Sequence, residues 1–272
     1  PYTFTYSIDG QAPITVNTAG IDNTVSINVP TNNDGTYNYT LLSVEDVNNG
    51  GCGNVATAAA SVTVDSLPLA VAGVSSNTIC VNETATVSGA SFRNGTVSWS
   101  HDGNGSLSDS TSPSPSYKAA AGDNTVTLTM LVTSDNTCSP QTATATYVVN
   151  VNALPVGTVS GDATVCEGDA DPIVTFSSSA GQTPFTYYYT VNGGNVQSLP
   201  VGTSTLTPGT SISGSNQYVL QSVVDGNGCT SLPPGGTSVA TVVVNSNPVG
   251  SLVVKPAVCQ NSAALLEFTA SG

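Results

Sequence analysis

Val149-Asn150-Val151-Asn152-Ala153-Leu154-Pro155, in the middle of the chain, is an alternating run of apolar and polar residues that ends in a short linker and a proline. The pattern occurs again at 62–68 and at 242–248. Alternation with a period of two is typical of a half-buried β-strand, because successive side chains point to opposite faces of the sheet. Three similar copies in one chain predict an architecture of tandem repeats.

Two classes of cysteine follow the same repeat. One class comes 11 or 12 residues after each proline and consists of Cys80, Cys166 and Cys259. The other class precedes each linker, in a turn rich in Asn, Asp and Gly, and consists of Cys52, Cys138 and Cys229. Successive members are 86 and 93 residues apart in the first class, and 86 and 91 residues apart in the second. A repeat of about 90 residues has the size of one immunoglobulin-like β-sandwich, and a solenoid unit is much shorter.

Both ends of the chain carry parts of the same repeat. Residues 1–10 match 184–193, and residues 266–272 match 174–180. We therefore expect the chain to start within one repeat and to stop within another, as part of a longer repeating protein. The predicted fold class is all-β, with tandem immunoglobulin-like Greek-key β-sandwich domains arranged end to end. The predicted units are a partial domain, two whole domains and a second partial domain, at 1–66, 67–152, 153–246 and 247–272.

Hairpin turns are predicted where Asp-Gly or Asn-Gly pairs separate alternating segments. With these turns, each whole domain holds about seven short strands, as a Greek-key sandwich requires. The third strand of each domain carries aromatic residues, and we expect them in the core: Trp99, Tyr187 and Tyr189. Alternation also predicts three equivalent inward positions, at Tyr39, Leu128 and Tyr218.

Composition limits the partners and the compartment. Only 7% of the residues are charged, and the formal net charge is −14. Lys and Arg together number three, and a polyanion with so few basic residues repels phosphate backbones. We therefore expect no nucleic-acid partner. No apolar run has the length of a transmembrane helix. Six cysteines in a polar chain favour an oxidising, extracellular setting.

One whole repeat resembles a known family. Residues 99–106 read Trp-Ser-His-Asp-Gly-Asn-Gly-Ser, and Pro-Ser-Pro-Ser-Tyr at 113–117 and an alternating Thr/Val strand at 121–129 follow. This order resembles the polycystic-kidney-disease (PKD) type of immunoglobulin-like domain, which shows a Trp-Asp-Phe-Gly-Asp-Gly-like turn, a Tyr and an alternating strand. The turn of this chain departs from that pattern, so the match is partial.

The flanking repeats resemble a second group. The Pro-Phe-Thr-Tyr segment at 184–187, the Gly-Cys turn at 228–229 and the Val-Cys-Glu-Gly start at 165–168 are similar to tandem repeats of giant Bacteroidota surface adhesins, such as SprB-type gliding-motility adhesins. The resemblance implies export by type IX secretion and anchoring through outer-membrane machinery. It also implies a cell-surface location, neighbouring repeats as partners, and a role in adhesion or gliding motility.

The pairing of the six cysteines is open among three schemes. Cys80 precedes the second strand of its domain and Cys138 follows the penultimate strand, and these strands run parallel in a Greek-key sandwich. The two residues are then about 30 Å apart, whereas a disulfide needs Cα atoms within about 7 Å. End-to-end stacking instead brings Cys80 towards the next domain, which favours the cross-joint scheme. The scheme within a domain pairs Cys80 with Cys138 and Cys166 with Cys229. The scheme along the chain pairs Cys52 with Cys80, Cys138 with Cys166, and Cys229 with Cys259. The scheme across a joint pairs Cys80 with Cys229 and leaves the other four cysteines to bond outside this stretch of chain.

Residues for catalysis are not expected. The single histidine, His101, has no nucleophile motif to serve, and we predict that it is a solvated turn residue. No Cys/His spacing predicts zinc, and no glycine-rich loop predicts phosphate binding. We therefore predict that the chain is not an enzyme and holds no resident cofactor.

Calcium is the best small-ligand hypothesis, because alternating oxygen donors occur in two loops, at Asp102, Asn104 and Ser106 and at Glu167, Asp169 and Asp171. Turn chemistry alone also explains such residues. Two Asp-Ser segments resemble a Bacteroidota O-glycosylation motif, which implies modification at Ser66 and Ser110.

The predicted function is a stalk or filament region of a large secreted adhesin. The alternatives are carbohydrate-binding modules that grip surface polysaccharide, and an accessory region of a secreted hydrolase.

Overall fold

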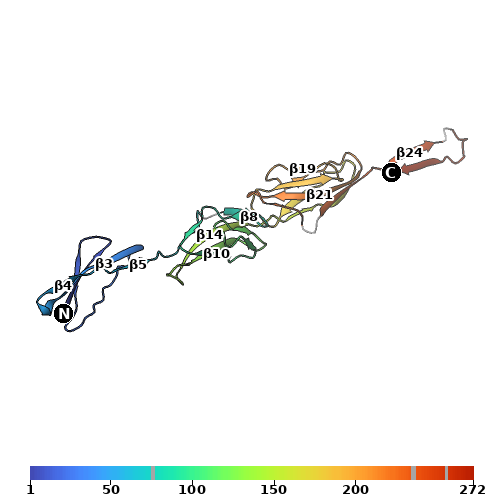
Figure 1. Cartoon of the computed structure of the whole chain (residues 1–272). Coiled ribbons are helices and arrows are strands. Elements are labelled where there is room, and N and C mark those ends of the chain that lie inside the picture. Colours follow the sequence, from blue (N-terminus) through green and yellow to red (C-terminus); the bar gives the residue numbers. More distant parts are fainter. Residues whose placement is uncertain (75–76, 234–236, 255–256) are drawn as a thin grey trace.

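The computed structural model describes residues 1–74, 77–233, 237–254 and 257–272. Strands are the main regular elements there, and one short 3-10 helix, η1 (Val47–Asn49), interrupts them. Four units follow one another along an extended molecule, from the N-terminal sheet to a C-terminal hairpin (Figure 1). The described residues include no helix with the length and hydropathy needed to cross a bilayer. The fold class is therefore all-β with domains in tandem, as the sequence predicts.

The second domain consists of two sheets around one core. One sheet has the order β10-β13-β14-β7, the other has the order β11-β12-β8, and β6 pairs with β9. Its strands β6–β14 are Leu69–Val71, Asn77–Cys80, Thr84–Thr86, Ser91–Arg93, Thr96–His101, Ser106–Ser108, Ser116–Lys118, Thr125–Thr133 and Thr142–Asn152. Strand β7 runs parallel to β14, whereas β13 is antiparallel to both β10 and β14. This is the Greek-key sandwich that the strand pattern predicts.

The third domain repeats this plan. One sheet has the order β16-β23-β21-β18-β19, with β22 paired to β21, and the other has the order β15-β17-β20. Its strands β15–β23 are Gly157–Ser160, Ala163–Cys166, Val174–Ser178, Thr186–Val191, Gln197–Ser198, Thr205–Leu206, Gly214–Val224, Thr230–Ser231 and Ser238–Asn245. Strand β16 runs parallel to β23, as β7 does to β14.

Each of these domains has its own core. The core of the second domain lies between Ala72 and Val151, and that of the third lies between Val159 and Val244. Each range falls inside one predicted whole domain. The expected core aromatic residues are buried, as the alternation predicts: Trp99, Tyr187 and Tyr189.

The N-terminal unit is a single sheet. Its strands β1–β5 are Tyr2–Ile8, Ile14–Asn17, Gly35–Asp46, Cys52–Val55 and Ala59–Val64. They take the order β2-β1-β3-β4, and β5 also pairs with β3. Among the described residues no second sheet pairs with it to form a sandwich. As a result Tyr39 is only half-buried, whereas the equivalent Leu128 and Tyr218 are buried.

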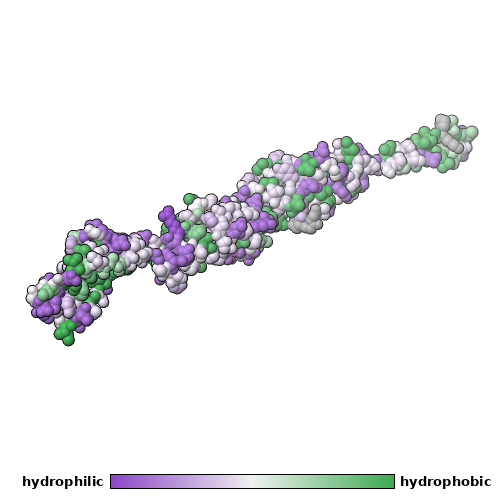
Figure 2. Space-filling model, in the orientation of Figure 1, coloured by the Kyte–Doolittle hydropathy of each residue, from purple (hydrophilic) through white to green (hydrophobic). Residues whose placement is uncertain are grey.

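The C-terminal unit is the antiparallel hairpin of β24 (Val249–Val254) and β25 (Leu266–Ser271). Every residue of both strands is exposed. Hydrophobic atoms gather on this hairpin and on the N-terminal unit in Figure 2. Apolar strands need a second layer to bury one face, and the described residues supply no such layer to either terminal unit.

Candidate functional site: the joints between domains

A disulfide connects the second domain to the third. Cys80 is the last residue of β7 and pairs with Asn152, the last residue of β14. It therefore lies at the end of the second domain from which the chain enters the third. Cys229 lies between β21 and β22, and the Cα atoms of Cys80 and Cys229 are 5.7 Å apart. This is the cross-joint scheme favoured by the stacking argument, and it joins residues 149 positions apart in the chain.

A buried aspartate holds the loop that carries Cys229. Asp225 is 5% exposed, and its Oδ1 accepts hydrogen bonds from the backbone N–H groups of Asn227 (3.0 Å) and Cys229 (2.8 Å). Its Oδ2 accepts from the backbone N–H of Gln182 at 3.0 Å. The Ser231 hydroxyl donates to the carbonyl of Pro155, in the linker that enters the domain. The cysteine is thus positioned by bonds within its own domain.

The joint between the N-terminal unit and the second domain has the same plan without a disulfide. Asn136 Nδ2 donates to the carbonyl of Ser66 at 3.0 Å, and the Thr137 hydroxyl donates to Asp65 Oδ2 at 2.5 Å. The Cys138 thiol donates to the carbonyl of Asp65 at 3.3 Å. Cys138 therefore touches the linker, at the place that corresponds to Cys229 in the next joint.

The remaining cysteines do not pair within this chain. Cys52, Cys138, Cys166 and Cys259 are free thiols. The structure therefore contains none of the disulfides of the within-domain or along-chain schemes. Cys166 ends β16 opposite Asn245, as Cys80 ends β7 opposite Asn152. In the third domain it therefore occupies the position that the disulfide-bonded Cys80 has in the second.

The acidic loop of the third domain uses its carboxylates in turns. Asp169 Oδ2 accepts from the backbone N–H of Cys166 at 2.7 Å, and Asp171 Oδ1 accepts from that of Thr210 at 3.1 Å. Across the described residues, no three His, Cys, Asp or Glu side chains gather as a metal site would require. Asp169 and Asp171 are thus bound to backbone amide groups, and calcium binding by Glu167, Asp169 and Asp171 stays a prediction.

The other calcium candidates lie in the second domain, where one of them contacts a buried acid. Asp102 Oδ1 accepts from the backbone N–H of Thr127 at 2.7 Å, and the backbone N–H of Asn104 donates to Asp123 Oδ1 at 2.7 Å. Ser106 begins β11. Calcium binding by Asp102, Asn104 and Ser106 stays a prediction.

Asp123 is a buried hydrogen-bonding centre that the sequence argument missed. Its Oδ2 accepts from the Tyr117 hydroxyl at 2.7 Å and from the backbone N–H of Ala120 at 2.8 Å. Burial alone would raise the pKa of Asp123, but the hydrogen bonds from Ala120, Asn104 and Tyr117 hold it below its usual value. Burial, together with the bond to Asp123, raises the pKa of Tyr117 to about 12. An Ala-Gly-Asp-Asn sequence gives no signal of burial, because the same residues are typical of exposed turns.

His101 differs from the prediction of a solvated turn residue. It is the last residue of β10, its ring lies 5.1 Å from that of Tyr117, and its Nδ1 is buried. Strand pairing with Leu128 places it on the core side of the sheet.

The two predicted O-glycosylation sites differ in their surroundings. The Ser66 hydroxyl donates to Asp34 Oδ2 at 2.5 Å, and this bond lowers the pKa of Asp34. Ser110 is half-buried, and its carbonyl accepts from the backbone N–H of Trp99 at 2.8 Å. Modification at either serine stays a prediction.

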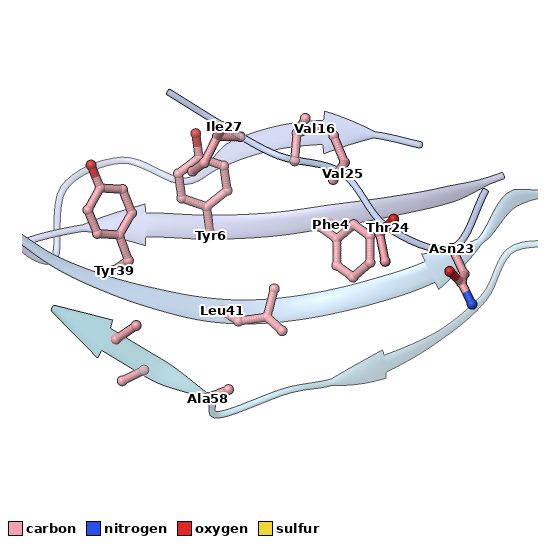
Figure 3. A pocket seen from close by; sticks show the side chains of 12 residues that line it. Phe4, Tyr6, Val16, Asn23, Thr24, Val25, Ile27, Tyr39, Leu41 and Ala58 are labelled. Carbon is pink, nitrogen blue, oxygen red and sulfur yellow. The ribbon is translucent and has the colours of Figure 1, made fainter. Parts of the chain in front are cut away.

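A groove of about 430 Å³ crosses the open face of the N-terminal sheet. Figure 3 shows Phe4 and Tyr6 on β1 and Tyr39 and Leu41 on β3, with the segment of Val25 and Ile27 beside them. The Tyr6 and Tyr39 rings are stacked with centroids 6.3 Å apart. The groove is apolar and aromatic, and nothing in the sequence alone separates these residues from core residues.

Comparison with known proteins finds similar solved structures but no family. No protein family model matches the chain. No curated protein matches it. Solved structures that are similar to it include three immunoglobulin domains of titin, with a TM-score of 0.40 and 12% identity over 91% of this chain and 88% of that one. Fibronectin(III)-like modules of Clostridium thermocellum CbhA have a TM-score of 0.30 and 12% identity over 66% of this chain and 95% of theirs. Drosophila N-cadherin EC1-4 has a TM-score of 0.36 and 12% identity over 79% of this chain and 58% of its own.

The fold and the joint together define a class: a tandem array of immunoglobulin-like β-sandwich domains in which a disulfide bridges one joint.

Proposed function

We propose that the chain is a stalk region of a secreted cell-surface adhesin, and that its role is mechanical. The observation that carries this proposal is the disulfide between Cys80 and Cys229. A bond inside one domain would stabilise that domain alone. A bond across a joint instead limits the rotation of one domain against the next, which is useful in a rod and of no use to independent binding modules.

The disulfide also changes the path of a pulling force. Tension applied at the two ends reaches Cys80, crosses to Cys229 and continues to the C-terminus. The residues between these cysteines include most of both whole domains and lie outside this path. One covalent bond then protects the chain between the two cysteines from extension, whereas β7 and β23 stay in the path of the force.

Single-molecule force spectroscopy on the full chain tests this proposal. Reduction of the disulfide should add about 500 Å of extensible length, because 149 residues of about 3.4 Å each enter the path of the force. The double variant Cys80→Ser/Cys229→Ser should give this length without reductant. Cys52→Ser/Cys166→Ser is the matched control and should behave as the unchanged chain. Equal extension before and after reduction would contradict the mechanical role.

The finer parts of the proposal concern where the stalk operates. We propose an extracellular, cell-surface location, adhesion or gliding motility in a Bacteroidota bacterium, type IX secretion with outer-membrane anchoring, and no enzymatic activity. Support comes from the disulfide, which persists in oxidising compartments, and from the resemblance of the repeats. Protease treatment of intact cells followed by non-reducing mass spectrometry should release the peptide that links Cys80 to Cys229. Recovery of this peptide only after lysis would contradict the location.

Polysaccharide binding is the rival function. Stacking on sugars needs exposed aromatic side chains, and seven aromatic residues of the two whole domains are instead buried in the cores: Trp99, Tyr117, Tyr147, Phe176, Tyr187, Tyr189 and Tyr218. These residues therefore support the stalk.

A further inference from the structure

The third domain has a small cavity beside its core, with a volume of about 230 Å³. Two loops form its walls: residues 183–185, which lead into β18, and residues 202–204, which lie between β19 and β20. Both sheets of this domain are described, so the cavity belongs to a complete sandwich. Pockets for drug-sized ligands measure about 300–1,000 Å³, so this cavity has room for a single ring-sized molecule.

Tyr187 of β18 brings a buried side chain to this cavity. The residue is 3% exposed and lines the cavity beside the two loops. No described residue forms a hydrogen bond with its hydroxyl group, and burial raises the pKa of Tyr187 above its ordinary value. The hydroxyl is therefore protonated at neutral pH and able to donate.

Other aromatic side chains of the cores do have acceptors for their polar hydrogens. Trp99 Nε1 donates to the carbonyl of Ser112 at 3.0 Å, and the Tyr117 hydroxyl donates to Asp123 at 2.7 Å. Such groups usually find a hydrogen-bond partner when they are buried. For Tyr187, the cavity is the place where a partner can lie.

The hydroxyl of Tyr187 is not needed for the strand pairing. Residues 1–10 match 184–193, and this alignment places Phe4 at the position of Tyr187. Both residues lie two positions before the register shift of their strand, as the pairing of β1 with β3 and of β18 with β21 shows. A phenylalanine thus fits the same place in the sheet, and the extra oxygen is free for another role.

Backbone hydrogen bonds hold both loops in place. The N–H of Gly202 donates to the carbonyl of Phe185 at 2.9 Å and so joins one loop to the other. The carbonyl of Ser204 accepts from the N–H of Phe176 at 2.7 Å. Buried Asp225 binds the backbone N–H of the residue before the first loop. The cavity is therefore formed in advance, and a ligand would not have to order these loops.

The residues around the cavity favour a neutral ligand with several hydroxyl groups. None of the described residues that line it is charged, and the net charge of −14 opposes the approach of an anion. Thr183, Ser204 and Tyr187 offer hydroxyl groups that can donate or accept. Pro184 and Phe185 supply an apolar wall. A sugar ring combines the matching properties, with hydroxyl groups at its edge and C–H groups on its faces.

We propose that this cavity binds one neutral pyranose ring and that the Tyr187 hydroxyl donates a hydrogen bond to it. The interaction goes beyond the stalk function and does not depend on it. A cavity for one ring also differs from the exposed aromatic platform on which a polysaccharide stacks. The third domain would then be a recognition point on the stalk.

Nuclear magnetic resonance titration of the full ¹⁵N-labelled chain tests this proposal. The probes are glucose, galactose, mannose and N-acetylglucosamine, with glucuronic acid and glucosamine as charged counterparts. At least one neutral sugar should shift the amide signals of 183–187 and 202–204 in a saturable way, with a dissociation constant of about 1–10 mM. The charged sugars should bind more weakly. Saturable shifts from no neutral sugar, shifts confined to other residues, or equal binding of the charged sugars would overturn the proposal.

Tyr187→Phe separates the hydroxyl from the ring that carries it. The variant should keep the fold, since Phe4 has the equivalent position, and should bind the sugar about 3–10-fold more weakly. Tyr188→Phe is the matched control, because Tyr188 is on the opposite face of β18 and is not part of the cavity. It should bind as the unchanged chain does. Equal affinity of the two variants would overturn the role of Tyr187.

Ser204→Leu fills the cavity from its exposed edge and should abolish binding. Thr205→Leu, at the next exposed position and outside the cavity, is the control and should still bind. Thermal unfolding should give both variants similar midpoints, which separates a blocked cavity from a misfolded domain. Binding that survives in Ser204→Leu would overturn the proposal. The force measurement on the Cys80–Cys229 disulfide is independent of these results, so either proposal can fail alone.

Discussion

Asp123 and Asp225 are buried carboxylates that bind several N–H and O–H donors each. Both organise a loop at one end of a sandwich, where backbone amide groups have no strand partner and need another acceptor. Removing such a centre leaves several buried donors unsatisfied at once, which costs more than the loss of one exposed hydrogen bond.

Asp123→Asn should destabilise the second domain by about 2–4 kcal/mol, because an amide cannot accept all of these bonds. Urea unfolding followed by Trp99 fluorescence measures this change. Asp135→Asn, at an exposed position of the same domain, is the control and should have little effect.

The lowered pKa of Asp123 also predicts a pH dependence. A carboxyl group with a lowered folded-state pKa contributes its full stability above the ordinary aspartate value of about 3.9. This contribution is lost as the pH falls through the lowered folded-state pKa. Unfolding of the unchanged chain should therefore become easier below about pH 4, and the Asp123→Asn variant should lose less stability over that range. Parallel pH profiles would contradict the role of Asp123.

Gly157 is needed for close packing. Gly157→Ala should destabilise the third domain by about 1–3 kcal/mol, because its Cβ would overlap Val223 and overpacking has this cost. Gly209→Ala, where a Cβ has open space, is the matched control. Thermal unfolding of both variants measures the difference, and equal midpoints would contradict the close approach.

At the scale of strands and sheets, the same register has two different surroundings. Strands β1 and β3 repeat the pairing of β18 and β21, including the register shift, but among the described residues another sheet covers only the second pair. The aromatic side chains are thus buried in one unit and line an open groove in the other. Pairing depends on local sequence, whereas burial depends on a second layer.

Hydrogen exchange should detect this difference. Amides of β1 and β3 should exchange faster than those of β18 and β21, because a sheet without a packed face opens at a lower free energy. Equal protection in the unmodified chain would contradict the open face.

For the whole molecule, the disulfide predicts that the two whole domains move together. Cys80→Ser/Cys229→Ser should leave both cores folded but allow bending at the joint. Small-angle X-ray scattering should then show a broader distribution of distances and a shorter mean length. The same variant should lower stability by about 2–5 kcal/mol where unfolding is cooperative. Cys52→Ser/Cys166→Ser should change neither property in a monomeric sample.

The sequence by itself determined the repeat, the strand periodicity and the inward positions of Trp99, Tyr187 and Tyr189, because these depend on residues that are close in the chain. It left three cysteine schemes open and did not reveal the groove, the buried Nδ1 of His101 or the carboxylate of Asp123 at the centre of a loop. Only the tertiary structure decided these features. Each depends on how sheets and domains pack, and it brings together residues that are far apart in the chain, such as Cys80 and Cys229.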